Sequence, residues 1–205
     1  MVWLVLSVAL WGLVHSLLAS ASVKDWVSRV VGYDGARFFR LGYNLFSVIS
    51  LTPIIWLWWR TPEPLLYRIP APWLYLTVLG QFIALIVLAV GVIQTDIFTF
   101  VGLRQLMEHG RRDERFVTSG LYRWVRHPLY TAGLVFIWLT PLVSVDTLVL
   151  LISVSLYLVV GAYFEERKLM LQFGAAYAVY KASTPMLIPG MSFHRNNNSM
   201  ISSHE

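Results

Sequence analysis

The sequence of 205 residues has no cysteine and few charged side chains. Without cysteine it can form no disulfide, no thiolate nucleophile, no cysteine-ligated metal site and no S-palmitoyl anchor. Charged residues make up 13% of the chain, against about a quarter in a typical soluble domain, and hydrophobic residues make up 57%. This balance excludes a disordered chain and argues against a water-soluble globule.

The motifs of common soluble enzymes are also missing. We find no glycine-rich phosphate loop, no G-x-S-x-G elbow, no H-E-x-x-H and no cluster of zinc ligands. The net charge of +5 is compatible with nucleic-acid binding, but in so apolar a chain it is more typical of Lys and Arg in cytoplasmic loops. We therefore expect neither a metal nor a nucleic-acid partner.

Long uncharged runs are what the sequence has instead. They cover residues 1–23, 41–59, 69–95, 129–145 and 147–164. A helix needs about 20 apolar residues to cross a bilayer, so the first three runs predict membrane spans. The last two are separated by Asp146 alone and predict a helical hairpin. The expected fold class is all-α: a polytopic membrane protein with about five transmembrane helices.

The basic residues indicate an orientation in the membrane. All 16 lie outside the five runs, with four in residues 21–40, six in 95–128, four after 164, two in 60–71 and none in 140–146. Because cytoplasmic loops are enriched in Lys and Arg, the first, third and last of the segments that flank the runs are predicted to be cytoplasmic. The N-terminus would then lie outside and the C-terminus inside.

Two polar segments lie at the ends of the predicted hairpin, at residues 120–133 and 165–168. Because a hairpin brings its ends together, it would place four side chains of the first segment near two carboxylates of the second. These residues are Arg123, Arg126, His127, Tyr130, Glu165 and Glu166. Pro128 suits the first turn of a helix, whose free N–H groups favour an anion. The alternative is that these charges are ordinary interfacial anchors.

Further polar residues lie within or beside the runs. His15 lies in the first run among small residues that usually pack helices together, although a histidine inside a membrane is a candidate functional residue. At the end of the third run, three side chains are expected either to line a substrate mouth or to pair with one another; they are Asp96, Arg104 and Gln105. Phe173, Tyr177 and Tyr180 have the spacing of an amphipathic helix on the cytoplasmic surface, which would cover a ligand from water.

These motifs occur in an order that resembles a known superfamily. The sequence Arg-His-Pro-Leu-Tyr at 126–130 is followed by Glu165-Glu166, by Phe173-Gly174-x-x-Tyr177-x-x-Tyr180 and by Pro185 to Pro189. This combination is similar to the isoprenylcysteine carboxyl methyltransferase superfamily of integral-membrane enzymes. Residues 98–105 and 184–189 most resemble the bacterial methanethiol S-methyltransferases and their relatives. The chain departs from the usual pattern at Ala132, where the family has glycine.

The resemblance implies an S-adenosylmethionine (SAM)-dependent methyltransferase in the bacterial inner membrane. Cofactor binding is expected at Tyr122, Arg123, His127, Pro128, Tyr130, Glu165 and Glu166, catalysis at Arg126 and His15, and substrate binding at Asp96, Arg104 and Gln105. Residues 1–95 would form three helices, 96–192 the catalytic region and 193–205 a disordered tail.

The acceptor expected from the resemblance is a small thiol such as methanethiol. A prenylated cysteine carboxylate and a phospholipid amine are the alternatives, and membrane lipid is the expected surrounding partner. A different functional class is also possible, in which the chain is a non-catalytic membrane partner or a transporter. A shared fold does not by itself establish enzymatic activity.

Overall fold

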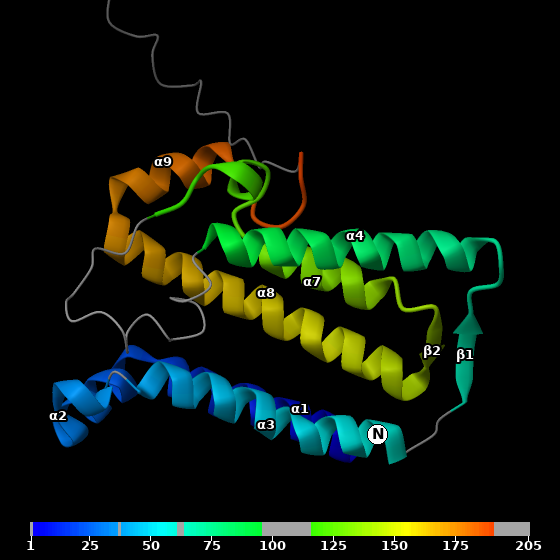
Figure 1. Cartoon of the computed structure of the whole chain (residues 1–205), viewed down its shortest axis with the longest axis horizontal. Helices are drawn as coiled ribbons and strands as arrows, with labels where there is room; N and C mark the ends of the chain where they lie inside the picture. The colour runs from blue at the N-terminus through cyan, green and yellow to red at the C-terminus, as the bar shows by residue number, and fades with distance from the viewer. Residues whose placement is uncertain (1, 37, 61–63, 96–115, 191–205) are drawn as a thin grey trace, which may run out of the picture.

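A computed structural model of the chain describes residues 2–36, 38–60, 64–95 and 116–190 (Figure 1). Its elements in chain order are α1 (Val2–Ala19), α2 (Ala21–Ala36), α3 (Phe39–Arg60), β1 (Leu65–Arg68), α4 (Trp73–Gln94), the 3₁₀ helix η1 (Gly120–Arg123), α7 (Pro128–Trp138), β2 (Leu142–Ser144), α8 (Val145–Phe173) and α9 (Ala175–Ser183). The predicted residues Asp96, Arg104 and Gln105 and the predicted tail at 193–205 lie outside the described residues.

In the part of the chain that the structure describes, four helices are long and apolar enough to cross a membrane: α1, α3, α4 and α8. They cover four of the five runs that the sequence marked as spans. The fifth, α7, has only 11 residues. At 1.5 Å per residue it is about 16 Å long, roughly half the thickness of a bilayer core. The chain is an integral membrane protein, and the expected count of five spans is not confirmed.

The run 129–145 does not form the continuous helix predicted for it. Pro141, which has no N–H group and disfavours helix at the residue before it, follows the end of α7. The chain then forms β2, which pairs antiparallel with β1 in a two-stranded sheet. The N–H of Ile69 donates to the carbonyl of Pro141 at 2.9 Å beside this sheet. The all-α class is therefore correct for the helices but omits this small sheet.

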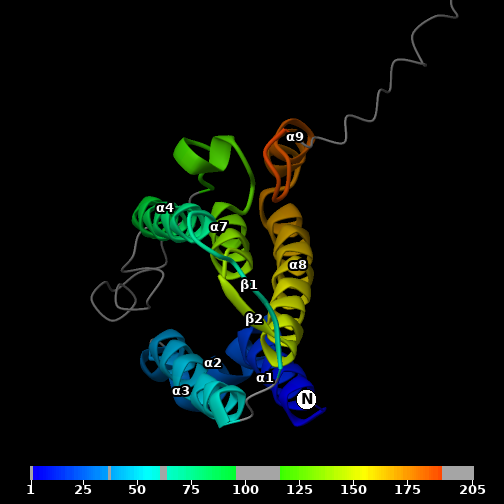
Figure 2. The same ribbon diagram turned by 90° about the vertical axis from the view of Figure 1, so that its right-hand side faces the viewer.

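The long helices form two layers joined by α8. Figures 1 and 2 show α4 beside α7 on one side and α1 beside α3 on the other. Helix α8 contacts both α1 and α7. In Figure 1, α2 and α9 lie at one end of the molecule, and β1 and β2 lie at the opposite end. Polar groups carried by the α9 end of α8 and by the start of α7 are thereby placed close together.

Small residues allow the close packing of α4 on α7. A Cβ atom at Gly91 would lie 2.7 Å from the side chain of Leu129, and one at Gly80 would lie 2.6 Å from that of Leu139. The side-chain amide of Gln81 donates to the carbonyl of Phe136 at 3.1 Å. Close backbone approach of this kind is how helices associate in lipid, where apolar burial drives little assembly. This packing fixes α7 at the position that the site requires.

Helix α8 continues past the predicted end of its span and includes Glu165 and Glu166. It ends at Phe173, because Gly174 has a φ of 51°, a left-handed backbone that glycine adopts without strain. Helix α9 then starts in a new direction and buries Tyr177 and Tyr180. The prediction that Phe173 shares one helix with these tyrosines is therefore wrong, although all three side chains lie close to the same aromatic ring, that of Phe116.

Candidate functional site

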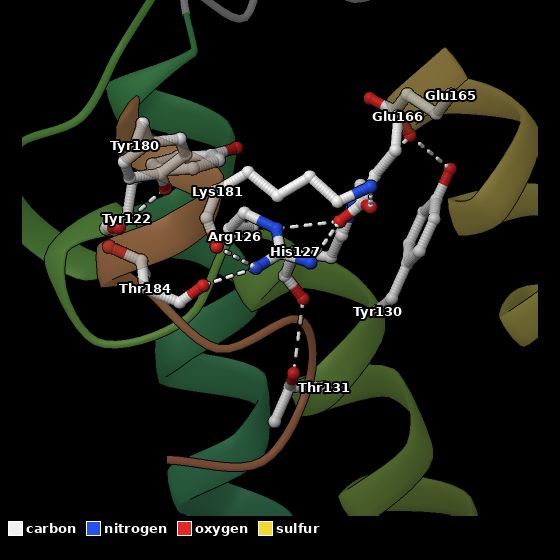
Figure 3. A network of polar contacts seen from close by, with 10 residues as sticks. All are labelled: Tyr122, Arg126, His127, Tyr130, Thr131, Glu165, Glu166, Tyr180, Lys181 and Thr184. Carbon is white, nitrogen blue, oxygen red and sulfur yellow. Dashed lines mark hydrogen bonds and ion pairs between the residues drawn. The ribbon is translucent and has the colours of Figure 1, made fainter. Parts of the chain in front are cut away.

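A buried ion pair lies where the start of α7, the end of α8 and α9 meet (Figure 3). The Nε atom of Arg126 donates to Oε1 of Glu166 at 2.6 Å, and Nη2 lies 2.5 Å from the same oxygen. The two side chains are only 8% and 4% exposed. Nη1 of Arg126 donates to the carbonyls of Lys181, at 3.1 Å, and Thr184. The guanidinium therefore holds groups of the protein together.

Lys181 is a member of this network that sequence reasoning missed. Its Nζ atom lies 2.8 Å from Oε2 of Glu166, so the buried carboxylate has a cation on each oxygen. Lys181 follows Tyr177 by four residues and so lies on the same face of α9. That spacing was the available signal, but it identifies Lys181 only once α9 is known to pack against Glu166.

The segment after α9 is bound to the start of α7. The backbone N–H groups of Arg126 and His127 donate to the carbonyls of Pro185 and Met186, at 2.9 and 3.1 Å. The hydroxyl of Thr131 donates to the carbonyl of Leu187 at 2.7 Å. The N–H groups of Arg126 and His127 are thus occupied by carbonyl groups of the chain, and the anion position expected at the first turn of α7 stays a prediction. The Pro-rich segment at 185–189 closes the site.

The two adjacent glutamates have different environments. Glu166 is buried in the ion pair, whereas the side chain of Glu165 is 46% exposed. Oε2 of Glu165 accepts a hydrogen bond from the hydroxyl of Tyr130 at 2.8 Å. Of the two glutamates, Glu166 is the one that pairs with Arg126. Glu165 keeps a carboxylate that a ligand can reach.

His127 lies between the two carboxylates. Its Nδ1 atom is 3.7 Å from Glu165 and its Nε2 atom 3.5 Å from Glu166, both longer than ordinary hydrogen bonds. The ring is 4% exposed and stacks on Tyr130 with centroids 5.3 Å apart. Nε2 is buried without a hydrogen-bond partner. A buried polar atom of this kind in a native structure calls for an explanation, and a ligand is one.

A cavity of about 210 Å³ opens beside Glu165. Its lining residues are mostly aromatic or aliphatic, with one carboxylate and one guanidinium among them: Thr95, Phe116, Val117, Tyr122, Arg126, Glu165, Leu169, Phe173, Tyr177 and Tyr180. The hydroxyl of Tyr177 is buried without a hydrogen-bond partner. Aromatic faces and a carboxylate both attract cations, so the cavity suits a ligand that carries a positive charge and a flat ring.

The tyrosines of this cavity stay neutral. Burial raises the pKa of Tyr122 to about 12, with the charge of Glu165 adding to the shift. Burial likewise raises the pKa of Tyr180 to about 12, although Arg126 opposes this. The hydroxyl of Tyr180 donates to the carbonyl of Tyr122 at 2.6 Å and thereby fixes η1 to α9 (Figure 3). At physiological pH these phenols provide aromatic walls and hydroxyl groups but no negative charge.

The structure brings together most of the predicted site residues. Tyr122, Arg126, His127, Tyr130, Glu165 and Glu166 all lie in the network or line the cavity. Pro128 is the first residue of α7, as expected. Arg123 instead lies over the ring of Trp124, 5.9 Å from its centroid, and does not line the cavity. His15 belongs to a separate cluster on α1 and α3.

Other members of the cavity were not predicted from the sequence. Thr95, Phe116, Val117 and Leu169 line it but carry no motif that distinguishes them from packing residues. Ala132, at the position where the resemblance expects glycine, is 3% exposed in the packed part of α7. The roles predicted for Asp96, Arg104 and Gln105 stay predictions, because those residues lie outside the described chain.

Comparison with known proteins agrees with this arrangement. The chain is 31% identical to a methanethiol S-methyltransferase of Crocosphaera subtropica, over 88% of this chain and 71% of the relative. It is 32% identical to the methanethiol S-methyltransferase of Pseudomonas deceptionensis, over 95% of this chain and 74% of the relative. Nurim of Bos taurus is 27% identical over 70% of this chain and 58% of its own length. No solved structure matches the chain.

The fold and the site define a class of integral membrane proteins with apolar helices around a charged site at one end. Within that class the family is shown directly, because the model of the family described as NnrU protein matches residues 3–188. The chain belongs to this family. The resemblance to membrane methyltransferases of the methanethiol type, inferred from the RHP and Glu-Glu motifs, is confirmed by these relatives.

Proposed function

We propose that the protein is an integral-membrane, SAM-dependent methyltransferase whose acceptor is a small thiol. The observation that carries this proposal is the aromatic cavity with the half-exposed carboxylate of Glu165 at its edge. The relatives named methanethiol S-methyltransferases support the reaction and the acceptor.

The residues of the cavity fit the chemistry of SAM. SAM carries a flat adenine ring, a ribose, a positively charged sulfonium and an amino acid group. Phe116, Phe173 and Tyr177 provide aromatic faces for the ring or the cation, and Glu165 provides an acceptor for a ribose hydroxyl or an attractive charge for the sulfonium. The partnerless atoms Nε2 of His127 and Oη of Tyr177 are available to polar groups of the ligand. Tyr122 closes the same wall.

The buried ion pair has a positioning role in this proposal. Arg126 binds Glu166, α9 and the segment after it, so it holds the cofactor residues in place without contacting the reacting atoms. Tyr130 orients the carboxylate of Glu165 through its hydrogen bond. Preorganised positioning of this kind contributes a large share of the acceleration in bimolecular reactions, up to roughly 7–11 kcal/mol.

SAM supplies an electrophilic methyl group when it is bound. An anionic acceptor and a cationic donor lose charge as they react, so a site that excludes water favours the transition state. The aromatic rings that line the cavity and the apolar helices of the protein would reduce the water around the reacting groups. Little acid or base machinery is needed at the cofactor itself, and the tyrosines that line this cavity stay neutral at physiological pH.

The proposal is tested by transfer of a labelled methyl group from SAM to three acceptors in parallel: ethanethiol, a prenylated cysteine and phosphatidylethanolamine. We expect labelled product from the thiol. Labelled product from the prenylated cysteine alone, or from phosphatidylethanolamine alone, would show that this compound and not the thiol is the methyl acceptor. A protein that is folded and neither methylates any of the three nor gains thermal stability with SAM would favour the non-catalytic class, because a ligand that binds the native state stabilises it.

We further propose that the protein lies in the bacterial inner membrane with its N-terminus outside and the α2 and α9 end in the cytoplasm. The positions of the basic residues support this orientation. Because the chain has no cysteine, single introduced cysteines can report it. Asp25→Cys on α2 should be protected from a membrane-impermeant maleimide in intact cells, whereas Leu66→Cys on β1 should be labelled. Both positions are exposed, and the reverse pattern would invert the topology.

A further inference from the structure

A second polar cluster lies inside the membrane-spanning helices, and the proposed cofactor cavity does not include it. His15 on α1 forms hydrogen bonds with two side chains of α3. Its Nε2 atom is 2.5 Å from the hydroxyl of Tyr43, and its Nδ1 atom is 2.9 Å from the hydroxyl of Ser47. An ionisable side chain within a membrane span is costly and is a candidate functional residue, and His15 is held there by two hydrogen-bonding partners.

The hydrogen bonds determine which nitrogen of His15 carries the proton. The hydroxyl of Ser47 donates to the carbonyl of Tyr43 at 2.7 Å, which uses its only hydrogen. Ser47 must therefore accept from His15, and Nδ1 carries the hydrogen in the neutral ring. Nε2 is then the unprotonated nitrogen, and the hydroxyl of Tyr43 donates to it. The arrangement has the order of a catalytic triad: a hydroxyl, a base and a group that orients the base.

The ring of His15 is held in place by its neighbours. Trp11 stacks on it with centroids 4.7 Å apart, and Nε1 of Trp11 donates to the hydroxyl of Ser50 at 2.9 Å. Tyr157 of α8 meets the His15 ring edge-on at 6.0 Å. It approaches α1 closely because position 12 is glycine: an added Cβ there would lie 3.2 Å from the Tyr157 ring. His15 and Tyr43 nevertheless remain only half-buried, so a small molecule can reach them.

Helix α8 connects this cluster to the proposed cofactor site, because it carries both Tyr157, which meets His15, and Glu165. Along α8, Tyr157 precedes Glu165 by eight residues, which corresponds to about 12 Å. Because Glu165 lies near the α9 end of α8, the cluster lies deeper among the membrane-spanning helices than Glu165 does.

We propose that Tyr43, His15 and Ser47 form a proton relay that ionises the thiol acceptor; the proposal rests on the proposed function. The acceptor's S–H bond breaks, its proton goes to the oxygen of Tyr43, and the hydroxyl proton of Tyr43 goes to Nε2 of His15. The products are a thiolate and a protonated His15, so charge and protons balance. The thiolate is the nucleophilic form of a thiol. SAM held at the proposed site would supply the methyl group: the methyl–sulfonium bond would break as the new C–S bond forms, and S-adenosylhomocysteine would leave as a neutral thioether. Tyr43 contacts the substrate, and Ser47 acts as a positioning residue.

The first test compares two thiols of different acidity at about pH 8. Ethanethiol is mostly protonated there and needs the relay, whereas thiophenol is already ionised and does not. We expect His15→Gln and Tyr43→Phe to lower kcat/KM for ethanethiol by about 100-fold or more, the usual size of general-base catalysis, and to change it little for thiophenol. Ser47→Ala should show the same pattern more weakly, with recovery in Ser47→Thr. Tyr75→Phe on α4, an exposed tyrosine elsewhere, is the matched control.

The second test needs no methyl donor. At about pH 6, below the point where free thiophenol ionises, binding to the wild-type protein should increase the absorbance of the thiolate, and binding to His15→Gln should not. An equal loss of transfer with both thiols, or no ionisation of thiophenol by the wild-type protein, would overturn the relay. Absence of transfer to either thiol by the wild-type protein would overturn the proposed function, even where the ionisation is observed.

Discussion

The cluster at the α9 end and the cluster between α1 and α3 use different polar chemistry. The first contains full charges, with the carboxylate of Glu166 bound by both Arg126 and Lys181. In the second, the described hydrogen bonds of His15 go to hydroxyl groups alone. Buried charges are tolerated near the membrane border, where oppositely charged side chains surround them. The bilayer core instead favours neutral hydrogen-bonding groups. This difference matches the roles that we propose, in which the first cluster holds a charged ligand and the second moves a proton.

Removal of Arg126 should have the largest effect on the charged cluster. Arg126→Met leaves Glu166 buried with Lys181 as its remaining cation and breaks two bonds to backbone carbonyls. Loss of one partner from a buried ion pair costs about 3–5 kcal/mol, so we expect a large drop in the free energy of unfolding in detergent. The exposed Arg167→Met is the control. Equal stabilities of the two variants would show that the ion pair does not hold the site.

Glu165→Gln should separate ligand binding from stability. Because the carboxylate is half-exposed and is not part of the Arg126 pair, the fold should be retained. Loss of its charge should weaken SAM binding by about tenfold or more, equivalent to about 1.4 kcal/mol. The measurement is the increase in Tm with SAM concentration, with Lys168→Gln on the same helix as control. An unchanged shift in Glu165→Gln would remove this residue from the cofactor site.

In the neutral cluster, a single lost hydrogen bond should cost less. Ser47→Ala removes the acceptor of His15 Nδ1, and hydrogen bonds between helices in a membrane contribute about 0.6 kcal/mol on average, with a maximum near 1.7. We expect a decrease of that size in the free energy of unfolding. A decrease as large as that of Arg126→Met would contradict the comparison and give the cluster a mainly structural role.

The smallest effect is expected for Lys181→Met. Its side chain is 43% exposed, and exposed ion pairs contribute about 0.2–1 kcal/mol. Glu166 keeps Arg126 in this variant, so stability should decrease by less than about 1 kcal/mol and the difference should shrink as salt is added. A larger loss that is independent of salt would place Lys181 among the essential partners of Glu166.

Much of the fold could be predicted from the sequence because lipid leaves few choices. Uncharged runs must be helical to satisfy their backbone groups, and four of the five predicted spans are helices of sufficient length. The exception is the run 129–145, where Pro141 and the pairing of β2 with β1 replace helix by strand. Pairing between residues 65–68 and 142–144 is a long-range contact that the hydropathy of either segment does not encode.

The sequence predicts which residues of the candidate site lie close together, but it does not predict which side chain pairs with which. Hairpin geometry alone brings the RHP segment to Glu165 and Glu166. Which glutamate pairs with Arg126 depends on how α8 is rotated against α7 and α9, and Lys181 becomes a partner only through the turn at Gly174. In the same way, the sequence shows a histidine in the first span, but only the packing of α3 on α1 gives His15 a tyrosine on one nitrogen and a serine on the other.

The sequence by itself therefore determined the membrane location, the helical class and the segments that meet, because hydropathy and charge act locally along the chain. The tertiary structure alone decided which charges are buried in pairs, which carboxylate stays open and which nitrogen of His15 is basic. The physical reason is that hydrogen bonds and ion pairs depend on distances of a few ångströms between groups far apart in the chain, and only the packing of α1, α3, α7, α8 and α9 sets those distances.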